Sequence, residues 1–486
     1  MITIDRTFLD EDGAPDGELL LTLLDWHDGQ RVRLGWLRDL YDRHHAIEAR
    51  RRLRGLPNNR LVHDLPGYIT AIAAGYLVGE PVTYSPPQEQ AAAFKTIQEA
   101  YVVSSVESVD AELAVDASVY GRAVELCYAD GESRPRVAQV SPLDCFVVYD
   151  DTVEHKPLFG VARREIRNRR MEREGEGVTV YTSGQAIYYR RVGREQPREE
   201  ARRAHYFGGV PMVEYWNNAR EQGDFEGVAS LIDAYDTLQS DRMNDKQQFT
   251  DAVFVLKGVG ALGVNDTEEV GAAEDAAEGE HGEPQTATAE QKAATDPSVR
   301  LRQTRTLFLP GDGADAQFVT KPDAESGNEV LRQSLNSDIH KLSMVPALTD
   351  EEFSGVASGV SLRYKLLGLE QLTKVKERWF REGLRARLRL FAAFLAKKGA
   401  PGVDVDKVQI AFTRSLPVND LEIAQTVATY QGMVPSELLL AQVPFVEDAE
   451  EAQRMLEKER AEAQKRQMEA FDARAFREQE EEDDEE

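Results

Sequence analysis

The sequence predicts an α+β fold that is mainly helical. Apolar residues recur every three or four positions over most of the chain, whereas the stretch from Arg122 to Tyr215 alternates with a period of two. With 486 residues, of which 41% are hydrophobic and 30% charged, the chain can bury a sizeable core. This length favours roughly two to four domains.

Three helical segments are expected before the β-rich stretch, each bounded by Gly or Pro. The first covers the initial fifty-five residues, where Leu and Trp carry the helical spacing, and Pro57 ends it. The second is a buried helix that follows Pro66 and ends at Gly79. The third runs from about Gln88 to Gly121.

Short strands separated by Gly, Pro and Asp turns predict an antiparallel β-rich part. They are RAVELCYAD, PRVAQV, CFVVYDD, FGVARREIR, GVTVYTSG and AIYYRRVG. Helical periodicity resumes at Phe225, and AVFVLKG from Ala252 predicts a further strand.

A low-complexity segment separates this strand from the next. Ala261 to Val299 is dominated by Ala, Glu, Gly and Thr and contains no aromatic residue, so we expect a disordered insertion. TRTLFLPGDG, which begins at Thr304, resumes the strand pattern. A helix is then expected from Ala324 to Pro346.

A loop rich in glycine and serine, EEFSGVASG from Glu351, precedes the longest predicted helix. That helix runs from Val360 to Lys398, with Gly368 and Gly383 as expected bending points. KVQIAFTRSLP, from Lys407, predicts a short strand. The helices of NDLEIAQTVATYQ and PSELLLAQ and an acidic tail follow it.

Charge is unevenly distributed along the chain, whose formal net charge is −28. Asp266 to Asp296 carries a net −9 and Glu447 to Glu486 a net −10, whereas Val360 to Lys398 has eleven basic and three acidic residues. Phosphate neutralisation dominates nucleic-acid affinity, so this balance argues against a tight, static nucleic-acid binder. It is compatible with a protein that DNA slides past. The basic residues of the long helix are also typical of an ordinary solvated helix face.

Targeting signals and membrane segments are not expected. Uninterrupted apolar runs are far shorter than the ~18 residues of a membrane span, and the N-terminus lacks the pattern of a signal peptide. Cys127 and Cys145 are too few for a disulfide framework, which favours reduced thiols and synthesis in a cytoplasm.

The sequence motifs typical of enzymes are either absent or wrongly spaced. Gly355 and Gly359 enclose only three residues, and Val360 stands where a phosphate-binding loop needs lysine. HExxH, CxxC and GxSxG are absent from the sequence. Asp150 and Asp151 could ligate magnesium, but such a pair after a strand is more typical of a turn.

Four segments resemble segments of portal proteins, the head-to-tail connectors of long-tailed, double-stranded DNA bacteriophages. They are PNNRLVHDLPGYITAIAAGYLVGEPVTY, DASVYGRAVELCY with CFVVYDDT, SLIDAYDTLQSDRMNDKQQFTDAVFVLKG, and VPALTDEEFSGVASGVSLRYKLLGLEQL. The resemblance covers about Arg33 to Ala441, and the segments stand in the order of the family.

This resemblance implies the portal fold, with wing, stem, clip and crown regions assembled as a ring around an axial DNA channel. The implied divisions are the wing at 1–223, a stem helix at 224–256, the clip at 257–323, a second stem helix at 324–348, a tunnel loop at 349–360, a long wing helix and strand at 361–417, crown helices at 418–470 and a disordered acidic tail at 471–486.

The resemblance also implies the site and the partners. The tunnel loop would comprise Asp350, Glu351, Glu352, Phe353, Ser354, Gly355, Val356, Ala357, Ser358 and Gly359, and the candidate channel-facing basic residues are Lys341, Arg363 and Lys365. The ring would usually have twelve subunits in the virion and would lie at one capsid vertex. Its implied partners would be double-stranded DNA, the large terminase subunit, a head-to-tail adaptor protein, and the major capsid and scaffolding proteins. The family implies no catalytic residue, cofactor, metal or membrane.

Two alternatives from other classes stay open on the residues alone. One is a magnesium-dependent, nucleic-acid-processing enzyme that uses Asp150 and Asp151. The other is an acidic capsid scaffold or adaptor, consistent with the two acidic segments.

Overall fold

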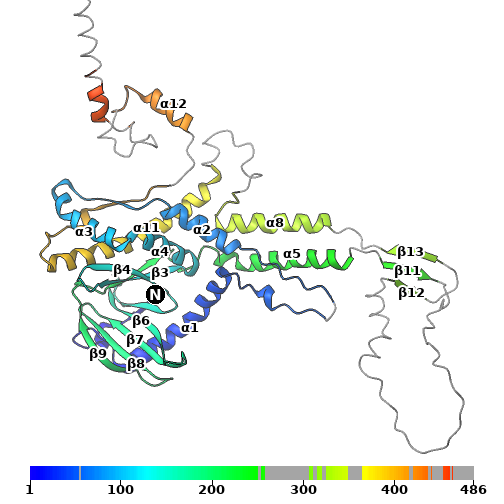
Figure 1. The fold of residues 1–486 in the computed structure, drawn as a ribbon, viewed down its shortest axis with the longest axis horizontal. Helices are drawn as coiled ribbons and strands as arrows, with labels where there is room; N and C mark the ends of the chain where they lie inside the picture. The colour runs from blue at the N-terminus through cyan, green and yellow to red at the C-terminus, as the bar shows by residue number, and fades with distance from the viewer. Residues whose placement is uncertain are drawn as a thin grey trace, which may run out of the picture. The chain divides into compact units, whose positions relative to one another are not determined.

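The computed structural model describes most of the chain and divides it into two compact units, Met1–Val345 with Gln371–Thr413, and Pro346–Glu370 with Arg414–Glu486. The described residues are 1–53, 56–249, 253–257, 306–309, 315–319, 325–348, 364–414, 420–435, 439, 453–459 and 462. Helices and sheets are mixed along the chain, as the predicted α+β class requires (Figure 1).

The first unit contains a six-stranded sheet in the order β1-β5-β6-β7-β8-β9. β1 pairs with β5 in parallel, and the other neighbours are antiparallel. The strands are β1 (Ile2–Ile4), β5 (Cys145–Asp150), β6 (Pro157–Arg167), β7 (Arg173–Tyr181), β8 (Gln185–Arg191) and β9 (Arg198–Ala204).

At β5 this sheet is covered on both faces, which explains why β5 is buried at consecutive positions. Phe146 and Val148 pack with Leu20 and Leu24 of helix α1 (Gly17–Tyr41) on one face. Cys145 and Val147 point to the opposite face, where the three-stranded sheet β10-β3-β4 supplies Met212 and Val124. The strands of that sheet are β10 (Met212–Trp216), β3 (Arg122–Ala129) and β4 (Pro135–Val140).

A larger core surrounds the long helix α11 (Leu367–Lys397). Phe380, Leu384, Leu388 and Phe391 recur at helical spacing and are buried. They pack with α2 (Leu65–Val78), α3 (Ala91–Ser104), α4 (Val106–Tyr120) and β3, together with β14 (Gln409–Ala411), which pairs with β2 (Thr83–Ser85).

Helices α5 (Ala229–Phe249) and α8 (Glu325–Ser343) pack side by side (Figure 1). Arg242 of α5 forms an ion pair of 3.1 Å with Glu329 of α8. Between the two helices in sequence lies a small sheet in the order β12-β11-β13. Its strands are β11 (Val253–Lys257), β12 (Thr306–Leu309) and β13 (Asp315–Val319).

Several predicted boundaries are wrong. The first helix covers only Gly17–Tyr41, because Arg43 adopts a positive φ of 69° after it and the chain leaves the helical path well before Pro57. The helix predicted from Gln88 to Gly121 is two helices, since Ser105 between α3 and α4 is left-handed, with φ 52°. Strands β1, β2, β9, β10 and β13 were not predicted.

The second unit contains α12 (Asp420–Tyr430), which confirms the helix predicted in NDLEIAQTVATYQ. Most of PSELLLAQ, the insertion predicted at 261–299 and the tail at 471–486 lie outside the described residues. Within the described part of the chain, no helix is both long and apolar enough to span a membrane.

Candidate functional site

The structure describes only two of the thirteen residues predicted to face or form a channel. Asp350 to Gly359 and Arg363 lie outside the described residues. Lys341 is exposed in the last turn of α8, and Lys365 is exposed just before α11. These two lysines belong to different compact units, so the predicted loop and its basic neighbours remain a prediction.

The aspartate pair considered for magnesium lies at a turn, as its sequence context indicated. Asp150 Oδ1 accepts hydrogen bonds from Thr152 Oγ1 at 2.7 Å and from the backbone N–H of Lys156 at 3.0 Å. The hydrogen bond from Thr152 lowers the pKa of Asp150. Asp151 is exposed beside it. Over the described ranges, no group of three or more His, Cys, Asp or Glu residues is arranged to hold a metal ion.

The basic residues of α11 do not all lie on a solvated face. Lys376 is 2% exposed and Arg387 is fully buried, on the same side as the apolar stripe. Burial of a charge is costly unless it is paired and hydrogen-bonded, so both residues require acidic partners in the core. The structure supplies them from elements far away in the sequence.

Arg387 is the centre of a buried polar cluster. Its guanidinium contacts both carboxylate oxygens of Glu125 in β3, at 2.6 to 3.0 Å, and Asp110 of α4 at 2.7 Å. Tyr215 donates its hydroxyl to Glu125 Oε1 at 2.9 Å. The guanidinium also lies over the rings of Tyr101 and Tyr215. Burial raises the pKa of Asp110, and the positive charge of Arg387 offsets part of this rise.

Lys376 makes the second buried connection from α11. Its ammonium pairs with Asp224 Oδ2, and the same oxygen accepts a hydrogen bond from Ser118 at 2.6 Å. Asn217 donates to the other carboxylate oxygen at 2.8 Å. The two cations therefore fasten one face of α11 to α4, β3 and the segment after β10.

Gly383 serves this packing. α11 is one continuous helix through this position, and a Cβ at Gly383 would lie 2.4 Å from the ring of Tyr215. The glycine lets the helix approach β10 closely. The bending points predicted at Gly368 and Gly383 remain predictions.

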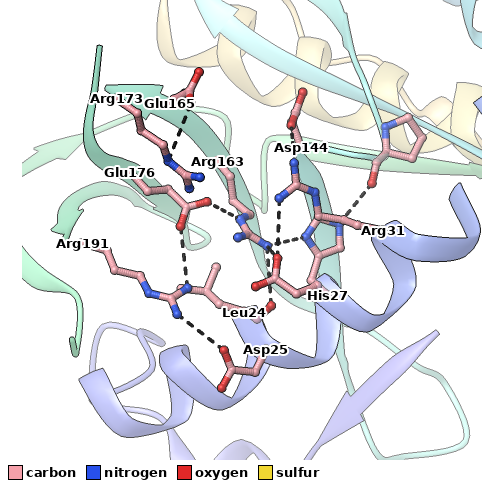
Figure 2. A network of polar contacts seen from close by, with 12 residues as sticks. Leu24, Asp25, His27, Arg31, Asp144, Arg163, Glu165, Arg173, Glu176 and Arg191 are labelled. Atoms are coloured by element: carbon pink, nitrogen blue, oxygen red, sulfur yellow. Dashed lines mark hydrogen bonds and ion pairs between the residues drawn. The ribbon is translucent and has the colours of Figure 1, made fainter. Parts of the chain in front are cut away.

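A second polar network joins α1 to the six-stranded sheet (Figure 2). Arg163 of β6 donates to Glu176 at 2.6 Å and to His27 Nδ1 at 3.1 Å. Because Nδ1 accepts, the Nε2–H of His27 donates to the backbone oxygen of Pro142 at 3.1 Å. Burial, together with the charge of Arg163, lowers the pKa of His27 to about 3, so the imidazole is neutral.

Two histidines converge on α5 although neither stands in a recognisable motif. Asp236 is fully buried and pairs with Nδ1 of both His45 and His63, the latter at 2.8 Å. Although burial opposes ionisation, the hydrogen bonds from His45 and His63 lower the pKa of Asp236. This cluster attaches the start of α5 to the segment between α1 and α2.

Comparison with known proteins decides the family. The family model "Phage portal protein, SPP1 Gp6-like" matches residues 21–465. The chain belongs to this family of phage portal proteins. The resemblance noted in the four sequence segments is confirmed.

Two curated portal proteins are similar to the chain. The portal protein of Bacillus phage SPP1 is 25% identical over 425 residues, which cover 83% of this chain and 76% of that protein. The portal protein of Clostridium phage phiCD119 is 27% identical over 266 residues, which cover 54% of this chain and 51% of that protein.

The buried charges are the residues that sequence reasoning missed. One signal was present: Arg387 falls between Leu384 and Phe391 on the apolar stripe of α11, where a cation predicts a buried acidic partner. The identity of that partner could not be read from the sequence, because Glu125 lies 262 positions away.

Proposed function

We propose that the chain assembles as a ring of twelve subunits around an axial channel that conducts double-stranded DNA into and out of a phage head. The observation that carries this proposal is the match to the portal family over residues 21–465. The ring would occupy one vertex of the capsid in the virion, after synthesis in the host cytoplasm. We assign no catalytic residue and no cofactor to it.

The regions proposed from the sequence are kept as part of this proposal. They are the wing (1–223), the stem (224–256 and 324–348), the clip (257–323), the tunnel loop (349–360), the long wing helix and strand (361–417), the crown (418–470) and the acidic tail (471–486). α5 and α8 support the stem assignment, because they pack against each other. In the sequence, the small sheet that suits a clip lies between them.

α8 also has a surface suited to contact between copies. Ile339 is buried, whereas Leu331 and Leu342 are 49% and 62% exposed. These two leucines are separated by about three helical turns and therefore lie on nearly the same face. A single copy of the chain leaves this face in water, and a neighbouring stem would cover it.

The charge distribution suits a channel that lets DNA pass. Asp350, Glu351 and Glu352 of the proposed tunnel loop would repel phosphate. Two of the cations of α11, Lys376 and Arg387, are committed to carboxylates in the core and are not available to DNA. We further propose that the clip docks the large terminase subunit and then a head-to-tail adaptor, and that the outer ring meets the major capsid and scaffolding proteins.

Negative-stain images of the purified protein test this proposal directly. We expect rings with a central hole, and Leu331→Glu combined with Leu342→Glu should abolish them. Val153→Glu is the matched control, since Val153 is 98% exposed at a turn and should tolerate the charge. A wild-type protein that stays monomeric at micromolar concentration would contradict the proposal.

A further inference from the structure

A pocket with apolar walls and a cationic rim lies in the first unit, where the six-stranded sheet, β3 and the end of α11 meet. Its volume is about 600 Å³, within the ~300–1,000 Å³ typical of ligand-binding pockets. β7, β8 and β9 form one side, and β3 and the C-terminal end of α11 form the others. Neither the predicted channel nor the buried clusters described above involve this pocket.

Strand register explains the hollow. Tyr181 of β7 pairs directly with Ala186 of β8, and Ala186 pairs with Arg203 of β9. Directly paired residues project from the same face, so these three form a row across the sheet. The small side chain of Ala186, between a tyrosine and an arginine, leaves the space.

Aromatic side chains form the deep walls. Phe207 and Phe394 are 2% and 4% exposed, and their rings stack with centroids 4.8 Å apart. Tyr181 is partly buried, and burial raises its pKa to about 12, so its hydroxyl stays neutral. The interior of the pocket therefore suits an apolar or aromatic group rather than a charged one.

Three cations surround this apolar interior. Arg203 lies over the ring of Tyr188, 5.6 Å from its centroid, which leaves the N–H edge of the guanidinium free to bind a carboxylate. Lys398 donates to the backbone oxygen of Ser133 at 2.9 Å, and Lys397 has no hydrogen-bond or ion-pair partner among the residues described. All three cations are exposed, and no carboxylate lines the pocket in the described part of the chain.

We propose that this pocket binds an acidic peptide segment of another protein, with a large apolar side chain inserted between the aromatic walls and flanking carboxylates on Arg203 and Lys397. Local charge complementarity supports this occupant, because three cations and no carboxylate line the pocket in the described part of a chain that is acidic as a whole. A nucleic-acid strand fits less well, because it needs a basic groove along its backbone, and Glu199 and Glu200 lie on the same strand as Arg203.

Fluorescence anisotropy with the full chain tests this site. The probe is a fluorescein-labelled peptide in which a phenylalanine and a leucine are flanked by glutamates. We expect saturable binding that weakens as salt is raised. Arg203→Glu combined with Lys397→Glu should weaken it about tenfold or more, since two attractive charges become repulsive. Tyr188→Ala should weaken it as well, through loss of the wall and of the platform for Arg203.

The matched control is Arg198→Glu combined with Arg378→Glu. It places the same charge change on the same strand, β9, and the same helix, α11, but outside the pocket. This control should bind the probe within about twofold of wild type, as expected of exposed charges remote from a site. Peptides with lysine in place of glutamate, or alanine in place of the two apolar residues, should not bind saturably.

Three outcomes would overturn the proposal. One is equal weakening in the pocket and control variants, which would mean that only overall charge matters. A second is stronger competition by single-stranded DNA than by unlabelled peptide, which would assign the pocket to nucleic acid. The third is that separated monomers bind the peptide whereas assembled rings do not, which would assign the pocket to contact between copies of the chain. Ring formation is scored independently by imaging, so failure here is distinguishable from failure of the portal proposal.

Discussion

Arg387 of α11 is fully buried, and its Nη2 donates to Glu125 Oε2 of β3 at 2.6 Å. The two residues are 262 positions apart, so this ion pair joins the C-terminal half of the chain to the first part of its β structure. Asp110, which contacts the same nitrogen at 2.7 Å, adds α4 to the connection. The position of α11 is thus fixed by charge as well as by its apolar stripe.

Arg387→Met should lower the free energy of unfolding by about 3–5 kcal/mol, because it leaves two buried carboxylates without their cation. Urea unfolding followed by circular dichroism measures this loss. The matched control is Arg389→Met, two positions along the same helix, whose partner Asp406 is exposed. It should cost less than about 1 kcal/mol. Equal losses in the two variants would show that the buried pair has no special role.

His27 should make the protein sensitive to mild acid. The folded state keeps this histidine neutral, with a pKa of about 3, whereas the unfolded chain protonates it near pH 6.5. The unfolded state therefore binds more protons, so the stability from His27 is present above about pH 6.5 and is lost progressively as the pH falls toward 3. Between about pH 7 and about pH 5.5 the loss should be about 1.3 kcal/mol.

His27→Gln removes this titration, and a glutamine amide can still donate toward Pro142. The variant should lose less stability than wild type over that pH interval, as measured by urea unfolding at both pH values. His44→Gln is the control, since the side chain of His44 is 68% exposed, and it should behave as wild type does. The lower pH stays above the isoelectric point of about 4.8, which limits precipitation. A wild-type-like pH dependence in His27→Gln would contradict the assignment.

Periodicity predicted the elements whose burial is regular. The apolar spacing of α11, the turns between β3 and β8, and the Pro and Gly around α2 are all local signals, and the corresponding helices and strands are present. β9 was missed because all seven of its residues are exposed, and its sequence REEARRA does not alternate between apolar and polar residues. The break at Ser105 was missed because a serine with positive φ has no distinctive sequence pattern.

The buried polar clusters could not be predicted from local patterns, because they depend on which distant segments of the chain come into contact. His45 and His63 occupy ordinary positions in the sequence, and only the fold brings both to Asp236. The proposed tunnel loop shows the opposite situation. Its composition and its resemblance to the family predict a role, while Asp350 to Gly359 lie outside the described residues.

Gly355→Val combined with Gly359→Val should leave ring assembly intact and reduce DNA packaging. The reason is steric, because a β-branched residue restricts the backbone conformations that glycine permits. Rings are counted in negative-stain images, and packaging is measured as DNA protected from nuclease in filled heads. Gly355→Ala with Gly359→Ala is the milder comparison and should reduce packaging less. Normal packaging in the valine variant would contradict the tunnel-loop assignment.

Deletion of Ala261 to Val299 should also preserve the ring. β11 and β12 are parallel, with Phe254 opposite Thr306 and Lys257 opposite Leu309, so their connection must return along the length of β11. After the deletion, Gly258–Gly260 and Arg300–Arg305 still provide nine residues. Nine residues reach up to about 30 Å when extended, against roughly 13 Å for the return along the strand. This connection is shorter than the dozen or more residues that usually join parallel neighbours, so its length needs a separate test.

A second variant separates length from sequence. Replacing Ala261 to Val299 by a Gly/Ser linker of equal length keeps the reach and removes the net negative charge of the segment. Rings from both variants would mean that the segment is dispensable for assembly. If only the linker variant forms rings, the shortened connection strains the pairing of β11 with β12. If neither variant forms rings, the acidic sequence itself takes part in assembly, and our prediction is wrong.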